Sequence, residues 1–322
     1  MRVAIAVCVR DEGPFLIEWV AYHRVIGVTD FIFYSNDCVD GTDTLLDHLA
    51  DRGLAQHFNN PAKGGKYQIA ALRDARTKPA FEDADWKLVI DADEFLNVRV
   101  GDGRIEDLIA ATGADVISAP MAMMANNGVR GFVDEPIIGQ FTMRNDQSNW
   151  CGEPNIAVKT LTRGGLDMGR MGAHRPFLTE DALSGVKWVD GSGRPVPDDF
   201  LNAKKGARLR LPTAGAHELC TLNHYALRSL DSFLVKQARG DVNSPNRSFD
   251  AAYWRARDAA EVDDRSILRM RSRMDDEIAR LMADPRTKAL HDQCVTHHRE
   301  AVQRLRKQEG YQTLVRELGM TG

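Results

Sequence analysis

Four predicted strands alternate with helix-forming segments in the first 96 residues of the chain. The apolar runs at residues 2–9 and 88–90 predict buried strands, and two further strands are expected at 31–34 and 54–58. Between them, helices are expected after Pro14, at 44–49 and at 66–78. This β-α-β-α-β-α-β order predicts an α/β fold with a doubly wound, mostly parallel sheet and right-handed crossovers.

The last of these runs leads directly into the acidic sequence Asp91-Ala92-Asp93-Glu94. Side chains alternate along a strand, so Asp91 and Asp93 are expected to point to the same side, at the sheet edge where α/β proteins bind ligands. Two carboxylates with one orientation repel unless a cation lies between them. Mg²⁺ or Mn²⁺ fits best, because these ions take oxygen ligands and keep positions free for phosphates. A strand that ends in solvated acids is the alternative.

Composition excludes several classes of protein. The 322 residues carry a net charge of −4, which argues against nucleic acid as a partner. The five cysteines are scattered without a C-x-x-C pair, as in a reduced cytoplasmic protein. No apolar run approaches the ~20 residues that span a bilayer, and charged residues interrupt the first run too early for a signal peptide. We therefore expect a cytoplasmic protein.

Three stretches carry a resemblance to a known family. They are RDEGPFLIEWVAYHRVIGVTDFIFYSNDCVDGTDTLL near the start, WKLVIDADEFL at residues 86–96, and HYALRSLDSFLVKQARG at residues 224–240. Together they resemble the glycosyltransferase family 2-type domain, in its branch related to family 92. The resemblance covers about residues 2–96 and 224–240. It implies a GT-A fold, a nucleotide-sugar donor that is UDP-linked, inversion at the anomeric carbon and a divalent cation bound by the D-x-D motif.

The resemblance also implies roles for individual residues. Asp93 is expected to bind the metal directly, and Asp91 to contact the ribose or a metal-bound water. Asn36 lies where family 2 enzymes commonly have a base-contacting Asp, so the sequence departs from the pattern there. Arg10 and Glu12 face the nucleotide in this interpretation, or lie in a solvated turn.

The middle of the chain holds candidates for the catalytic base and a third metal ligand. An inverting transferase needs a carboxylate that removes the proton of the acceptor hydroxyl, and sequence order favours Glu153, with Asp146 as runner-up. The resemblance to the GT-A fold also implies a C-terminal histidine as third metal ligand. His174 and His224 are the two candidates, because imidazole suits Mn²⁺. Strands are expected at 139–144, 155–161 and 171–177. Residues 179–215 are predicted to be an ordered insertion or a lid over the acceptor site.

The sequence pattern of the C-terminal part predicts a helical extension. We divide the chain into a catalytic domain, 1–226, and a helical extension, 227–322. A helix at 227–239 presents Lys236 and Arg239, which could approach a diphosphate or form a solvated basic face. The helical pattern at 251–318 suits packing against the catalytic domain or a second subunit, which would give a homo-oligomer. Docking at a membrane surface is the weaker alternative.

The leading hypothesis is a metal-dependent hexosyltransferase that moves a sugar from a nucleotide sugar to a glycan or lipid-linked acceptor, as in polysaccharide biosynthesis. A glycan-binding module on a degenerate transferase scaffold would instead bind carbohydrate without nucleotide or metal. A nucleotidyltransferase is disfavoured, because residues 10–13 hold one glycine where a Gly-rich phosphate loop is expected.

Overall fold

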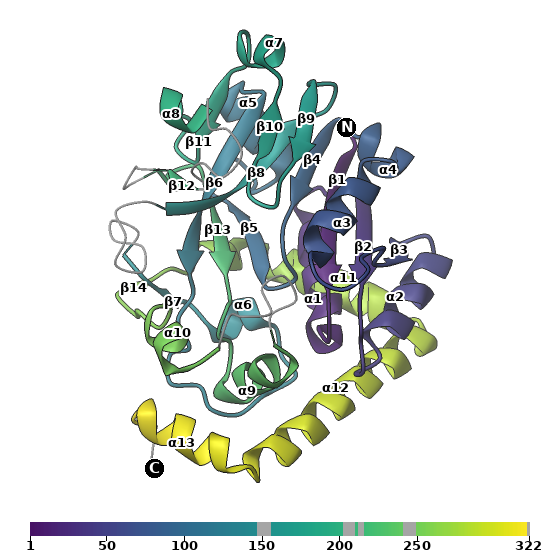
Figure 1. Ribbon diagram of the computed structural model, residues 1–322, viewed down its shortest axis with the longest axis vertical. Coiled ribbons are helices and arrows are strands. Elements are labelled where there is room, and N and C mark those ends of the chain that lie inside the picture. Colours follow the sequence, from purple (N-terminus) through teal and green to yellow (C-terminus); the bar gives the residue numbers. More distant parts are fainter. Residues whose placement is uncertain (147–155, 202–209, 212–215, 241–248, 321–322) are drawn as a thin grey trace.

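The computed structural model describes residues 1–146, 156–201, 210–211, 216–240 and 249–320. Within these residues ten strands form one sheet, whose main path has the order β3-β2-β1-β4-β8-β6-β13-β5 (Figure 1). The first four strands of this path are parallel to one another. They are β1 (Val3–Val9), β2 (Asp30–Ser35), β3 (Gln56–Asn59) and β4 (Trp86–Val89).

Helices cover both faces of this parallel part, as the alternation of apolar side chains requires. Val3 and Ile5 of β1 pack on one face, in the same core cluster as helices α1 and α11. Ala4 and Ala6 point to the other face, against α3 and α4. The helices between these strands are α1 (Gly13–Val25), α2 (Thr42–Asp51), α3 (Tyr67–Ala75) and α4 (Pro79–Glu82). The predicted doubly wound α/β sheet is confirmed.

The second half of the sheet is mixed. Strand β8 (Ile156–Arg163) lies antiparallel between β4 and β6 (Val116–Met123), and β13 (Cys220–His224) lies parallel to β6. Strand β5 (Glu94–Val98) directly follows the acidic turn but pairs antiparallel with β13, not with β4. The acidic turn therefore lies where the chain leaves the parallel strands. Helix α5 (Ile105–Thr112) follows β5.

Two of the predicted strands are wrong in detail. The expected strand at 171–177 is a hairpin of β9 (Met168–Met171) and β10 (Pro176–Leu178), because the chain reverses where the Gly172 backbone NH bonds to the Arg175 carbonyl, 3.1 Å away. The expected strand at 139–144 begins in helix α6 (Ile137–Gln140) and ends in the two-residue β7 (Met143–Arg144), which pairs with β14 (Val262–Asp263).

The described part of residues 179–215 is built into the fold. Strand β11 (Trp188–Asp190) adds to β6, and β12 (Arg210–Leu211) adds to β8. Helices α7 (Glu180–Leu183) and α8 (Asp198–Leu201) connect to them. This supports the ordered insertion for the described residues.

Helices dominate from residue 230 onward, as predicted, and they pack against the sheet domain. Helix α11 lies on α1, and α12 runs along one edge of the molecule from α2 past α1 to α9 (Figure 1). The helices are α9 (Leu230–Arg239), α10 (Ala251–Arg255), the 3₁₀ helix η1 (Ser266–Met270), α11 (Arg271–Met282), α12 (Pro285–Arg306) and α13 (Glu309–Glu317). None of the described helices is both long and apolar enough to cross a membrane.

Candidate functional site

The loops that follow β1 and β2 are bonded to each other. Asp11 adopts a left-handed backbone conformation, with φ of 49°, and its Oδ1 accepts a hydrogen bond from the Val39 backbone NH at 2.7 Å. The Thr42 hydroxyl oxygen accepts from the backbone NH groups of Glu12 and Gly13, at 3.0 and 2.7 Å. These bonds hold the start of α1 and fix two strand ends side by side.

Asp91 lies beside a buried lysine of the neighbouring strand. Lys159 of β8 is 1% exposed, and its Nζ lies 3.1 Å from both Asp91 Oδ2 and Glu94 Oε2. Gln68 of α3 donates to the other Asp91 oxygen at 3.2 Å. Burial opposes the charge on Lys159, but the two carboxylates outweigh it and raise the pKa of this ammonium. Asp91 is therefore balanced by a cation fixed inside the sheet.

Asp93 is balanced by a different cation. Its Oδ2 lies 2.8 Å from Nζ of Lys236 on α9 and 3.5 Å from Nε2 of His224, the last residue of β13. Burial opposes ionisation of Asp93, but these neighbours outweigh it and hold the pKa of the carboxyl well below its usual range. The strand β4 ends at Val89, so Asp91 and Asp93 lie in a turn and not on one strand face. The strand-alternation argument for their shared orientation is therefore wrong.

A third carboxylate, Glu12, is held between two arginines. Arg228 donates from Nη1 to Glu12 Oε2 at 2.7 Å, and Arg239 donates to Oε1. Arg228 also lies over the ring of Phe15, 3.7 Å from its centroid, and donates to the Ala92 carbonyl of the acidic turn. Burial raises the pKa of Glu12, but both arginines outweigh it and lower the pKa overall.

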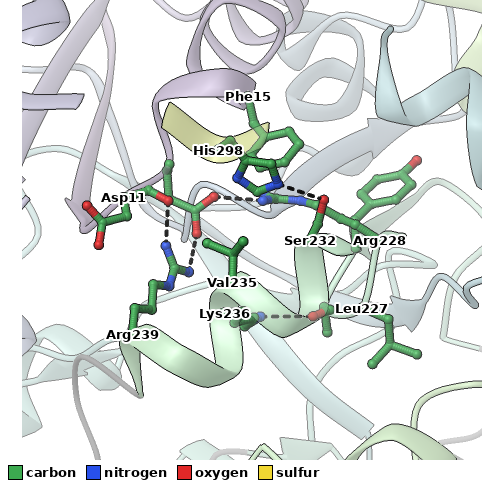
Figure 2. A pocket seen from close by; sticks show the side chains of 12 residues that line it. Asp11, Phe15, Leu227, Arg228, Ser232, Val235, Lys236, Arg239 and His298 are labelled. Carbon is green, nitrogen blue, oxygen red and sulfur yellow. Dashed lines mark hydrogen bonds and ion pairs between the residues drawn. The ribbon is translucent and has the colours of Figure 1, made fainter. Parts of the chain in front are cut away.

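Figure 2 shows that Arg228, Lys236 and Arg239 line one pocket. Lys236 and Arg239 reach it from α9, and Arg228 from the segment just before that helix (Figure 2). His298 of α12 closes the far side, where its Nε2 lies 3.3 Å from the Ser232 hydroxyl. Burial lowers the pKa of His298 to about 4, so this imidazole is neutral near pH 7. The full lining is Asp11, Glu12, Phe15, Tyr225, Ala226, Leu227, Arg228, Ser232, Val235, Lys236, Arg239 and His298.

The protein offers a divalent cation two ligands of suitable chemistry. Asp93 supplies a carboxylate oxygen and His224 an imidazole nitrogen, and the two already face each other at 3.5 Å. This donor set fits Mn²⁺. His174, the competing histidine, lies in the β9–β10 turn, where its Nδ1 bonds to the Val158 carbonyl at 3.0 Å. Among the described residues no group of three or more His, Cys, Asp or Glu could hold a metal without further ligands.

Asn36 and Arg10, the candidates for contact with the nucleotide, each have a side-chain atom without a hydrogen-bond partner among the described residues. Asn36 is 8% exposed, and its amide nitrogen donates to Asp37. Within the described residues its amide oxygen is buried without a partner. Arg10 is half-buried, and its Nε lies 3.9 Å from Asp11 Oδ2. Both residues border the loops that Asp11 and Thr42 hold together.

The candidate catalytic bases are Asp146 and Glu153. Asp146 is exposed on the loop after β7, where its backbone NH donates to Glu261 Oε2 at 2.5 Å. Glu153 lies outside the described residues. Both assignments stay predictions.

Sequence reasoning missed the roles of Arg228 and Lys159. Arg228 lies within the motif at 224–240, next to the two cations that were singled out. Lys159 is a charged residue in the middle of the mostly apolar strand IAVKTLTR, a pattern that indicates a buried counter-charge. A search for unpaired charges in apolar strands could have found it.

Sheet and site together define an α/β protein with a charge-balanced, partly enclosed cluster at its strand ends. Comparison with known proteins shows what parts of the chain are similar to. Residues 4–133 match the family model of glycosyltransferase family 92. A family 92 protein of Ricinus communis is 32% identical over 104 residues, which are 31% of this chain and 18% of the relative. One of Oryza sativa subsp. japonica is 25% identical over 192 residues, 57% of this chain and 28% of the relative.

The chain thus spans less than a third of the length of either relative. Among solved structures, S. aureus TarS covers 95% of this chain and 92% of its own, at 11% identity and a TM-score of 0.33. TarS in complex with UDP-GlcNAc covers 41% of this chain and 37% of its own, at 16% identity and a TM-score of 0.28. Scores this low add nothing to the fold described above. The sequence matches show that part of this chain is similar to glycosyltransferase family 92.

Proposed function

We propose that this chain is a metal-dependent glycosyltransferase of the GT-A type, which moves a sugar from a UDP-linked donor to a glycan or lipid-linked acceptor with inversion. The observation that carries the proposal is the contact between Asp93 and His224 beside Lys236, Arg228 and Arg239. Two metal ligands and three phosphate-binding cations at one strand end suit a nucleoside diphosphate.

Each group has a role in the proposed reaction. Asp93 and His224 would hold the cation, whose positive charge stabilises the leaving diphosphate. Lys236, Arg228 and Arg239 would bind the phosphate oxygens with charge-assisted hydrogen bonds. Asn36 would contact the uracil edge with its unpaired amide oxygen.

The acceptor side is assigned from sequence alone. A carboxylate, Glu153 or Asp146, would take the proton of the acceptor hydroxyl as that oxygen attacks the anomeric carbon. We place the reaction in polysaccharide biosynthesis in the cytoplasm, with hexosyl transfer as its type. Free thiols at all four described cysteines support a reducing compartment. Association with a membrane surface or with a second copy through the C-terminal helices belongs to the same proposal.

The first experiment is thermal unfolding with UDP, GDP or CMP, each with and without Mn²⁺. A ligand that binds only the folded state stabilises it by about 2.7 kcal/mol at a hundredfold excess over Kd. We expect UDP with Mn²⁺ to raise Tm by several degrees and the other nucleotides to have no effect. No response to any nucleotide would contradict the proposal and favour a glycan-binding module, which glycan arrays would then test.

The matching variant is Asp93→Ala. We expect it to lose the response to UDP with Mn²⁺ and about 1000-fold of the transfer rate, roughly 4 kcal/mol of transition-state stabilisation. Asp51→Ala, which removes an exposed carboxylate at the end of α2, serves as the control and should change neither. Full activity of folded Asp93→Ala would contradict the metal assignment.

A further inference from the structure

Every carboxylate at the candidate site already has a cation from the protein. Lys159 balances Asp91 at 3.1 Å, and Lys236 balances Asp93 at 2.8 Å. Glu12 is balanced by Arg228 on one oxygen, and by a second arginine on the other. The site is therefore close to neutral before any ligand enters, and an added charge of either sign would be opposed.

The cation at Asp93 occupies the oxygen that a metal would use. Lys236 Nζ and His224 Nε2 both approach Oδ2 of Asp93, at 2.8 and 3.5 Å. A divalent ion bound between Asp93 and His224 would lie next to the ammonium group, at a buried position where like charges repel strongly. Lys236 must leave this oxygen for the ion to bind.

The Lys236 side chain is less enclosed than the Lys159 side chain. The Lys159 side chain is 1% exposed and is fixed between two carboxylates in a central strand. The Lys236 side chain is 16% exposed, lies on a helix and lines the pocket together with Arg228 and Arg239. A diphosphate bound beside these three cations would give the Lys236 ammonium a new anionic partner.

The protein also supplies too few ligands for a metal alone. Asp93 and His224 are two, and no cluster of three or more potential ligands occurs in the part of the chain that the structure describes. Mn²⁺ and Mg²⁺ prefer six ligands, so phosphate oxygens and water must complete the set.

We propose that the divalent cation and the donor diphosphate bind this site as a pair, and that Lys236 exchanges Asp93 for the diphosphate as they enter. The inference rests on the proposed function. The exchange keeps the site near neutrality, because the ion and the diphosphate carry opposite charges. Lys236 thereby couples the two binding events and shields Asp93 from metal when donor is absent.

The test measures Mn²⁺ binding to the full chain by the electron paramagnetic resonance signal of free Mn²⁺, with and without UDP. For the unaltered protein we expect weak Mn²⁺ binding that tightens at least about tenfold with UDP, within the usual range of coupling between ligands. By linkage, Mn²⁺ must tighten UDP binding by the same factor.

Lys236→Met should shift the two affinities in opposite directions. Without UDP, Mn²⁺ should bind at least about tenfold tighter, because Asp93 is freed, while UDP with Mn²⁺ should bind about tenfold weaker. Lys236→Arg, which keeps a cation on Asp93, should leave the weak binding of Mn²⁺ alone unchanged. Lys288→Met removes the same charge from an exposed pair on α12 and should change neither affinity.

The outcomes separate the exchange from the function. Unchanged Mn²⁺ affinity of free Lys236→Met, with metal-dependent UDP binding intact, would overturn the exchange and leave the transferase proposal standing. If the unaltered protein binds UDP equally well with and without Mn²⁺, Lys236 is a permanent counter-ion and the exchange is also wrong. Failure of the unaltered protein to bind UDP under any condition would overturn the proposed function itself, and the exchange with it.

Discussion

Asp91 and Asp93 lie two residues apart in one turn, yet the cations that balance them come from different layers of the molecule. Lys159 reaches Asp91 from a central strand and is closed off from solvent. Lys236 reaches Asp93 from α9, a helix outside the sheet, and borders a pocket. The comparison teaches that one half of the acidic turn is built as a fixed part of the core, and the other half as a place where partners can change.

The largest expected difference between the two halves is in stability. Lys159→Met removes the only described cation that pairs with both Asp91 and Glu94, so the two carboxylates lose their shared counter-charge. Breaking such a pair costs about 3–5 kcal/mol. Lys236→Met should cost less, because Lys236 is more exposed than Lys159 and His224 stays 3.5 Å from Asp93. Urea unfolding measures the loss of unfolding free energy in both variants. Equal losses would show that the two lysines do not differ in this way.

A smaller effect on stability is expected from Glu18 of α1, a buried carboxylate that is bonded to backbone NH groups. Its oxygens accept from the backbone NH groups of Ile137 and Ile138, at 2.8 and 3.1 Å, and burial raises its pKa from 4.5 to about 7. The folded state then binds a proton more tightly than the unfolded state does. Its contribution is complete below about pH 4.5 and is lost as pH rises through about 7, by up to about 3 kcal/mol.

Urea unfolding between pH 5 and pH 8 measures this slope. Glu18→Gln keeps the size of the side chain and should remove the loss of stability at the upper end of the range. A slope that is the same in Glu18→Gln would assign the pH dependence to another group. Glu12, paired with two arginines, has its pKa shifted the opposite way.

The smallest effect concerns how α9 is held in place. Arg306 of α12 donates to both oxygens of Asp231 in the first turn of α9, at 2.9 and 2.8 Å. Asp231 is buried, but Arg306 is partly exposed, so Arg306→Ala should cost about 1 kcal/mol. Arg304→Ala, an exposed neighbour on α12, is the control. A loss equal to that of the control would mean that this pair does not hold α9.

The parallel half of the fold could be predicted because its information is local. Strands β1, β2 and β4 each contain an apolar run, and Pro14 lies in the first turn of α1 as expected. The mixed half could not, because β5 pairs with β13, more than a hundred residues later in the chain. No local pattern specifies such a pairing, and short apolar runs do not show their direction in the sheet.

The candidate site divides in the same way. The acidic turn at 91–94 could be predicted because the carboxylates directly follow a strand. Their partners could not be, since Lys159 and Lys236 lie 68 and 143 residues further along the chain. Lys236 was named as a cation of the predicted helix at 227–239, and His224 as a candidate metal ligand, whereas their contact with the same oxygen of Asp93 comes only from the fold.

The position of α12 has a consequence for the order in which the protein is made. His297 bonds to the Asp40 carbonyl at 2.8 Å, and the Cys294 sulfur lies so close to Gly13 that a Cβ there would be 2.5 Å from it. These residues are synthesised about 260–280 positions after the residues they contact. At about 5–20 residues per second, the nascent sheet waits roughly 15–60 s with this loop bare. During that interval the groups that α12 covers in the folded protein are open to water and to other chains.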